Sequence, residues 1–323
     1  MADIDRPASR RSMILGSGTL GLASALAAVA GGAAGADGAA ITSKPGTPMV
    51  DRGFVRIDEG PVHYRYVGNP GRGASLPILM AHAGPGSSEY FAGMMPGLAK
   101  DRFVFAPDML GNGDSPPPAR SETDIGYYVD ATIRVMDALK IERVDFYGAH
   151  TGAQIGCEMA VRHPARIRRL ALDGIPLFTP AFKQELLERY APPIAPDAWG
   201  GHLAWAWTRM REGSQYWPHY AQDEAHRLAS STRTPEQMHH AVMDVLKVLS
   251  TYHIAFRASF RHDVHALLPQ IAQPTLVMSI KRDPLHVYLD EAAAMIRNSQ
   301  RIMIDTDAGA GGKLGALKQF FEA

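Results

Sequence analysis

The stretch GAHTG, Gly148–Gly152, decides how this chain folds, because it stands between a predicted strand and a predicted helix. The segment Arg143–Tyr147 before it is typical of a short buried strand. The segment Ala153–His163 after it carries apolar residues at helical spacing. A sharp turn from strand to helix strains its central residue and requires small neighbours, which the two glycines supply. We therefore expect a strand–turn–helix unit with His150 at the turn.

Strands and helices are predicted to alternate along most of the chain. Phe54–Asp58 and Val62–Val67 predict an opening hairpin, and further strands are expected near residues 76, 103, 143 and 167, with helices near 87, 125 and 153. This alternation with short connections predicts an α/β fold with a doubly wound, mostly parallel sheet. Ligands bind such sheets at the carboxyl ends of the strands. Four polar residues lie at or just past these ends: His82, Asp108, His150 and Asp173.

Three motifs occur in a fixed order. The first is HAGPGSS at His82–Ser88, the second is DMLGNGDS at Asp108–Ser115, and the third is GAHTG. They resemble the H-G-G-P-G-S-S loop, the D-x-x-G-x-G-x-S turn and the nucleophile elbow of the α/β-hydrolase superfamily, particularly its iminopeptidase and epoxide-hydrolase-like branches. The resemblance implies an eight-stranded sheet with an inserted helical cap over the active site.

Two of the three catalytic positions depart from this family. Histidine stands at position 150 where the family has its nucleophilic serine, and Ala310 stands where the catalytic histidine is expected after the last strand. The resemblance places Asp283, which follows the apolar strand Pro274–Ile280, at the position of the triad acid; the alternative is a solvated aspartate in a turn. A Ser-His-acid mechanism is therefore not available to this chain.

The remaining groups still support chemistry. The resemblance implies that the backbone N–H groups of Gly84 and Thr151 form an oxyanion hole, which requires no particular side chain. The imidazole of His150 is long enough to approach Asp283 or, alternatively, Asp173. A carboxylate–imidazole pair is suited to general-base catalysis near neutral pH. Direct attack by the imidazole is the alternative.

Several other histidines and one tyrosine are candidates for lesser roles. His82 is expected to organise its loop or to contact the substrate. Tyr252 and His253 either contact the cavity or belong to an amphipathic cap helix. The pairs at residues 239–240 and 262–265 have no compact ligand spacing, so no metal site is predicted. No cofactor is expected either.

The predicted domains follow from these assignments. They are a twin-arginine signal peptide (1–36), a linker (37–50), the first part of the α/β-hydrolase core (51–176), the helical cap (177–264) and the last part of the core (265–323). The cap segment is rich in aromatic residues. A small, largely apolar substrate is therefore expected.

The N-terminal segment predicts export. Ser9–Leu15 (SRRSMIL) resembles the twin-arginine signature, and the weakly apolar stretch Gly16–Ala34 leads to a candidate cleavage site ending at Ala36. We expect a periplasmic or secreted protein whose precursor interacts with the twin-arginine (Tat) export machinery and which keeps no stable membrane anchor; an uncleaved transmembrane anchor is the alternative. Cys157 is the only cysteine, so folding requires no intrachain disulfide.

Composition further restricts the possible functions. The 33 basic and 33 acidic residues balance, which does not favour nucleic acid as a partner. The sequence predicts an enzyme centred on His150, with hydrolysis as the first hypothesis and lyase, cyclase or cofactor-free oxygenase chemistry as alternatives. A ligand-binding protein that has lost the chemistry is a further alternative. The sequence indicates neither the substrate nor the oligomeric state.

Overall fold

The computed structural model describes residues 48–71, 73–228, 233–305 and 308–323. The predicted signal peptide and most of the predicted linker lie outside the described residues.

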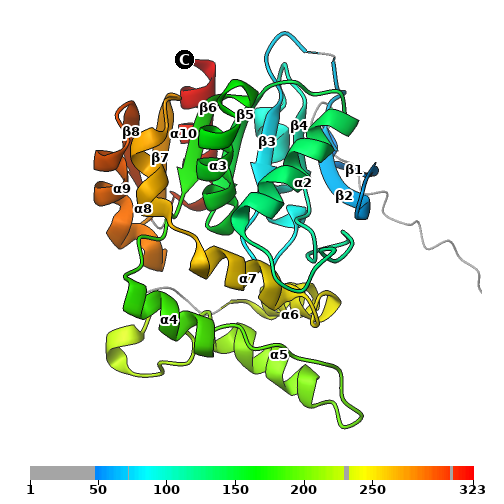
Figure 1. Cartoon of the computed structure of the whole chain (residues 1–323), viewed down its shortest axis with the longest axis vertical. Helices are drawn as coiled ribbons and strands as arrows, with labels where there is room; N and C mark the ends of the chain where they lie inside the picture. Colours follow the sequence, from blue (N-terminus) through cyan, green and yellow to red (C-terminus); the bar gives the residue numbers. More distant parts are fainter. Residues whose placement is uncertain (1–47, 72, 229–232, 306–307) are drawn as a thin grey trace, which may run out of the picture. The chain divides into compact units, whose positions relative to one another are not determined.

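An eight-stranded sheet with the order β1-β2-β4-β3-β5-β6-β7-β8 forms the centre of the described region (Figure 1). The first two strands make the predicted hairpin, β2 pairs antiparallel with β4, and all later pairs are parallel. The strands are β1 (Asp51–Ile57), β2 (Gly60–Val67), β3 (Ile78–Ala81), β4 (Val104–Pro107), β5 (Val144–Ala149), β6 (Ile167–Asp173), β7 (Thr275–Ile280) and β8 (Ser299–Ile304). The predicted mostly parallel sheet is confirmed.

Helices cover both faces of this sheet, as the doubly wound prediction requires. Within the described residues the α-helices are α1 (Met95–Leu98), α2 (Ile125–Ala138), α3 (Thr151–Arg162), α4 (Pro180–Arg189), α5 (Gly201–Glu212), α6 (Pro235–Lys247), α7 (Tyr252–Arg261), α8 (Val264–Leu267), α9 (Leu289–Met295) and α10 (Gly309–Glu322). The apolar residues of α2, α3 and α9 pack on one face, and those of α1 and α10 pack on the other. Strand β3 shows the division: Leu79 belongs to the first core, and its neighbours Ile78 and Met80 belong to the second.

The register of the sheet brings three strand ends together. Ala149 at the end of β5 lies opposite Asp173 at the end of β6, and Asp173 lies opposite Met278 in β7. The turns after these three strands are consequently neighbours. This edge holds His150, Asp173 and the loop that contains Asp283.

The chain between β6 and β7 includes helices α4 to α8, and in Figure 1 helices α4 and α5 lie below the sheet with α7 between them and the sheet. Helices α4 to α7 have an apolar core of their own that includes Phe178, Tyr190 and Phe256. Of the aromatic residues in this segment, Trp217 packs against this core, whereas Trp199 is 95% exposed. The exact boundaries 177–264 stay a prediction. None of the helices in the described part of the chain is both long enough and apolar enough to span a membrane.

Candidate active site

His150 occupies a strained turn between β5 and α3. Its backbone has φ 49° and ψ −108°, in the positive-φ region that residues other than glycine seldom adopt. A Cβ atom on Gly148 would lie 2.3 Å from the carbonyl oxygen of Gly152, and one on Gly152 would lie 2.0 Å from that of Ala81. Both glycines are therefore required for close approach of the backbone.

The imidazole of His150 is paired with Asp283. Its Nε2 atom lies 2.6 Å from Oδ2 of Asp283, and the His150 side chain keeps 38% of its surface exposed. The other carboxylate oxygen accepts a hydrogen bond from the backbone N–H of Leu285, which holds the carboxylate in place. Asp283 is 11% exposed and is therefore not the solvated turn residue of the alternative interpretation.

Gly174 makes room for this pair. A Cβ atom there would lie 2.7 Å from Cδ2 and 2.8 Å from Nε2 of His150, and the residue has φ +72°. Any side chain at this position would collide with the imidazole. Gly174 thus belongs to the site, although its place after strand β6 gave no sequence signal of that role.

The pairing of His150 with Asp283 shifts the pKa of each group in favour of its ionised form. Burial by itself lowers the pKa of His150, but the charge of Asp283 and the hydrogen bond to it more than offset this, so the pKa is raised above 6.5. Burial by itself raises the pKa of Asp283, and the imidazolium and the hydrogen bonds reverse this, so the pKa is lowered. This electrostatic coupling is what a histidine oriented for proton transfer requires.

The second acid candidate, Asp173, has other partners. Its Oδ2 atom accepts hydrogen bonds from the hydroxyl of Tyr147 at 2.6 Å and from Nζ of Lys313 at 2.5 Å, while its backbone carbonyl accepts the N–H of His150. Burial alone would lower the pKa of Lys313, but the Asp173 carboxylate outweighs it and the pKa is raised. The structure thus brings Asp283, not Asp173, to the imidazole.

Lys313 is a site residue that the sequence analysis missed. It lies in the first turns of α10, is 7% exposed and lies near the position where the family resemblance placed the catalytic histidine. Ala310 lies on the same helix and lines a cavity together with Asp283 and Lys313, but it carries no group that transfers protons. The only sequence signal was a lysine in the glycine-rich segment after the last strand.

The two predicted oxyanion donors lie close together. A Cβ atom on Gly84 would be 3.9 Å from Oγ1 of Thr151. Thr151 is the first residue of α3, so its N–H has no acceptor within the helix and is free for a ligand. The arrangement is compatible with two N–H groups that bind a developing oxyanion.

His82 and Asp108 hold loops in place. The buried ring of His82 bonds the carbonyl of Ala83 through Nδ1 and accepts the N–H of Met109 at Nε2; burial lowers its pKa, which keeps it neutral. Asp108 accepts hydrogen bonds from the N–H groups of Ser88 and Asp114 and bonds the ring of His63.

His63, Asp108 and Asp114 also form a compact group of metal-ligand residue types. Their ligand atoms are already engaged, because the guanidinium of Arg52 donates to Nε2 of His63 and pairs with the Asp114 carboxylate. A cation of the protein itself therefore occupies the place that a metal ion would need. We interpret the group as a hydrogen-bonded turn.

The positions of Tyr252 and His253 do not indicate a catalytic role. Tyr252 is 1% exposed, packs in the core of helices α4 to α7, and donates its hydroxyl hydrogen to the carbonyl of Pro192 at 2.5 Å. His253 packs edge-on against it, and burial followed by the charge of Arg257 lowers its pKa. The amphipathic-helix alternative explains both.

Two cavities lie against the site. One, of about 660 Å³, is lined by Asp283, Ala310 and Lys313; the other, of about 700 Å³, is lined by the loop that contains Gly84. Both are also lined by Tyr90, Gly213, Arg233 and Gln237, so they are neighbouring parts of one cleft.

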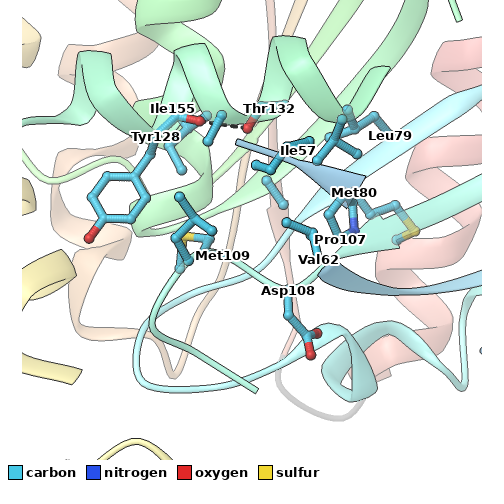
Figure 2. Close-up of a pocket in the computed structure, with 14 residues that line it drawn as sticks. Ile57, Val62, Leu79, Met80, Pro107, Asp108, Met109, Tyr128, Thr132 and Ile155 are labelled. Atoms are coloured by element: carbon cyan, nitrogen blue, oxygen red, sulfur yellow. Dashed lines mark hydrogen bonds between the residues drawn. The ribbon is translucent and has the colours of Figure 1, made fainter. Parts of the chain in front are cut away.

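A third cavity belongs to the core. It has a volume of about 30 Å³ and is enclosed by mostly apolar side chains such as Val62, Met109 and Ile155 (Figure 2). The hydroxyl of Thr132, which also faces it, is bonded to the carbonyl of Tyr128. Asp108 also lines this cavity, but His150, Asp283 and Lys313 do not, and the cavity has room for little more than a water molecule.

Known proteins resemble this chain along different shares of its length. A 2-hydroxymuconate semialdehyde hydrolase from Pseudomonas sp. strain CF600 is 45% identical over 105 residues, which cover 32% of this chain and 37% of that protein. A proline iminopeptidase from Heyndrickxia coagulans is 27% identical over 138 residues, or 42% of this chain and 47% of that protein. The first of these matches thus spans little more than a third of the relative's length.

The fold is shared with solved hydrolases. The enol-lactonase from Burkholderia xenovorans LB400 superposes with a TM-score of 0.62 at 20% identity, covering 84% of this chain and all of that one. The family model described as "alpha/beta hydrolase fold" matches residues 77–307, well over half of the chain. With the sheet order and the elbow described above, this match shows that the chain belongs to the α/β hydrolase fold family.

Proposed function

We propose that this protein is an exported enzyme that hydrolyses a small substrate by general-base catalysis from His150. The observation that carries the proposal is the 2.6 Å contact between Nε2 of His150 and Asp283 at the elbow of a hydrolase fold. The relatives named above are hydrolases, which supports hydrolysis over lyase, cyclase or oxygenase chemistry.

The tautomer follows from this contact. Because Nε2 donates its hydrogen to the Asp283 carboxylate, the lone pair of the neutral ring lies on Nδ1. Nδ1 takes a proton from water as the water oxygen attacks the substrate carbonyl carbon. The negative charge that develops on the carbonyl oxygen is stabilised by the N–H groups of Gly84 and Thr151. The imidazolium then returns the proton to the leaving group, which restores the neutral ring.

A ligand-binding protein without catalysis is the second candidate. The observation that favours it is Ala310, which leaves the family's base position without a proton-transferring group. Against it stands the 2.6 Å contact between Nε2 of His150 and Asp283, which orients the imidazole for proton transfer.

The test uses a panel of p-nitrophenyl esters and lactones, followed by pH profiles on the best substrate. Activity should rise with pH through a midpoint above 6.5, because the base must be neutral and Asp283 holds the pKa of His150 above its ordinary value. His150→Ala should lower kcat by about 10²- to 10⁴-fold. Asp283→Asn should lower kcat and move the midpoint down, because the anion that stabilises the imidazolium is gone. His239→Ala, at an exposed histidine on α6, is the matched control.

Two results would overturn this mechanism. Unchanged turnover in His150→Ala would remove the imidazole from the reaction. A His150→Ser variant that forms an acyl-enzyme would show that a serine at this position is activated without a histidine after β8.

A fluorophosphonate probe should leave the wild type unlabelled, and labelling that persists in His150→Ala would move the site to Ser87 or Ser88.

A further inference from the structure

The cleft beside the candidate site is bordered by two arginines, one on α5 and one just before α6. Arg209 lines the 700 Å³ cavity, and Arg233 lines both cavities. Arg209 is 6% exposed and Arg233 is half-buried. The site of the proposed reaction shares this cleft, because Gly84 and Asp283 also line it.

Neither guanidinium has a carboxylate partner within the described residues. The Nε atom of Arg209 is buried without a hydrogen-bond partner among them, while its guanidinium lies 4.6 Å from the ring centre of Tyr190. Arg233 donates only to the carbonyl of Met210, at 2.8 Å. The acid nearest to Arg209 in sequence, Glu212, is already paired with Arg211 at 2.5 Å.

The two arginines are close enough for their positive charges to repel each other. Burial lowers the pKa of Arg233, and the positive charge of Arg209 lowers it further. Burial lowers the pKa of nearby His219 to about 3, with Arg209 and Arg189 contributing, so its ring is neutral. Burying like charges without a counterion is costly, and proteins ordinarily provide a partner.

The acids that line the cleft do not serve as that partner. Glu89 is paired with Arg65 at 2.5 Å, and Asp283 is paired with His150. Asp244 also lines the 700 Å³ cavity, and burial raises its pKa. In the described region no carboxylate lies within ion-pair distance of Arg209 or Arg233. One part of the cleft is therefore basic and unneutralised.

We propose that Arg209 and Arg233 bind the carboxylate group of a small amphiphilic substrate. The guanidinium group matches a carboxylate in charge and in planar geometry. Tyr190, Met210 and Phe256 line the same cavity and offer contacts to an apolar body. This inference narrows the expected, largely apolar substrate to one with an anionic end. It rests on the proposed function only in calling the bound molecule a substrate.

The test measures binding, without turnover, by calorimetry with benzoate and benzamide, which have nearly the same shape and differ in charge. Wild-type protein should bind benzoate at least about tenfold more tightly than benzamide, since a hydrogen bond to a charged group contributes about 10- to 100-fold. Arg233→Gln and Arg209→Gln should each remove most of this preference. Arg227→Gln, at an arginine between α5 and α6 that pairs with the exposed Glu224 and lines neither of the two cavities, is the matched control and should keep it.

Equal affinity of the wild type for benzoate and benzamide would overturn the proposal even if the buried Arg209→Gln variant fails to fold. Inorganic phosphate that displaces benzoate and binds more tightly would also overturn it, by identifying the ligand group as phosphate. His150→Ala should bind benzoate as the wild type does. Failure of the catalytic proposal and failure of the anion site are therefore scored separately.

Discussion

At the scale of single residues, the site depends on a histidine at a positive-φ position, a backbone conformation that larger residues seldom adopt. His150 keeps the strained turn of a nucleophile while its ring extends to Asp283, a distance that a serine hydroxyl would not cover. The reach of the imidazole was foreseeable from covalent geometry alone. The choice between Asp283 and Asp173 was not, because it depends on a third residue, Lys313, that binds Asp173.

Gly174 offers a test of how closely this ring is held. Gly174→Ala would place a Cβ within 2.8 Å of the imidazole and force a side-chain-bearing residue to φ +72°. We expect a loss of at least about 1 kcal/mol of stability from the backbone alone. The ring should be displaced from Asp283, so its pKa should fall toward 6.5, as measured by NMR titration of the histidine protons.

The matched control is Gly315→Ala. Gly315 lies on the exposed face of α10, and a Cβ there meets nothing within 4 Å. Helix propensity should make this variant more stable by about 0.5–1 kcal/mol. If Gly174→Ala behaved like Gly315→Ala and left the His150 titration unchanged, the ring would not be confined as described.

At the scale of elements, the sequence predicted the sheet well because its signals are local. Buried strands are short apolar runs, and the glycine pair at the elbow fixes a strand–turn–helix unit by close contact. The sequence predicted the start of α10 less well, because a lysine after glycines is ordinarily a solvated residue. That Lys313 is buried follows only from its contact with Asp173 at the end of β6, which no local pattern encodes.

The buried pair between α10 and β6 should be essential for stability. Lys313→Met leaves the Asp173 carboxylate buried without its counterion, and breaking such a pair costs about 3–5 kcal/mol. Adding Asp173→Asn removes the uncompensated charge and keeps an acceptor for Tyr147, so the double variant should recover much of the loss. Urea denaturation measures both.

Lys318→Met, at a less buried lysine of the same helix, is the control and should change stability little. A double variant as unstable as Lys313→Met alone would mean that the lysine contributes through packing of its stem and not through the charge of Asp173.

At the scale of the whole molecule, the cleft combines residues that are distant in sequence. Arg209 and Arg233 come from different segments of the helical region, and Gly84 comes from a loop of the sheet. The aromatic residues predicted a largely apolar substrate because they are numerous, but several of them pack with one another. Convergence of two arginines on one cavity is a tertiary property, so composition could not reveal it.

Export is the remaining whole-molecule proposal, and it can be tested without a substrate. Cys157 is fully buried, and burial raises the pKa of its thiol, so the described fold needs no oxidising compartment. A protein of this kind can fold in the cytoplasm and then leave through the twin-arginine route.

Replacing Arg10 and Arg11 by lysine preserves the charge but removes the signature, so the precursor should stay in the cytoplasm, as followed by cell fractionation. Arg6→Lys, at an arginine outside the pair, is the control and should be exported with its N-terminus shortly after Ala36. Wild-type protein that keeps residues 1–36 in a membrane fraction would instead establish an anchor, because a cleaved signal leaves no such segment on the mature chain.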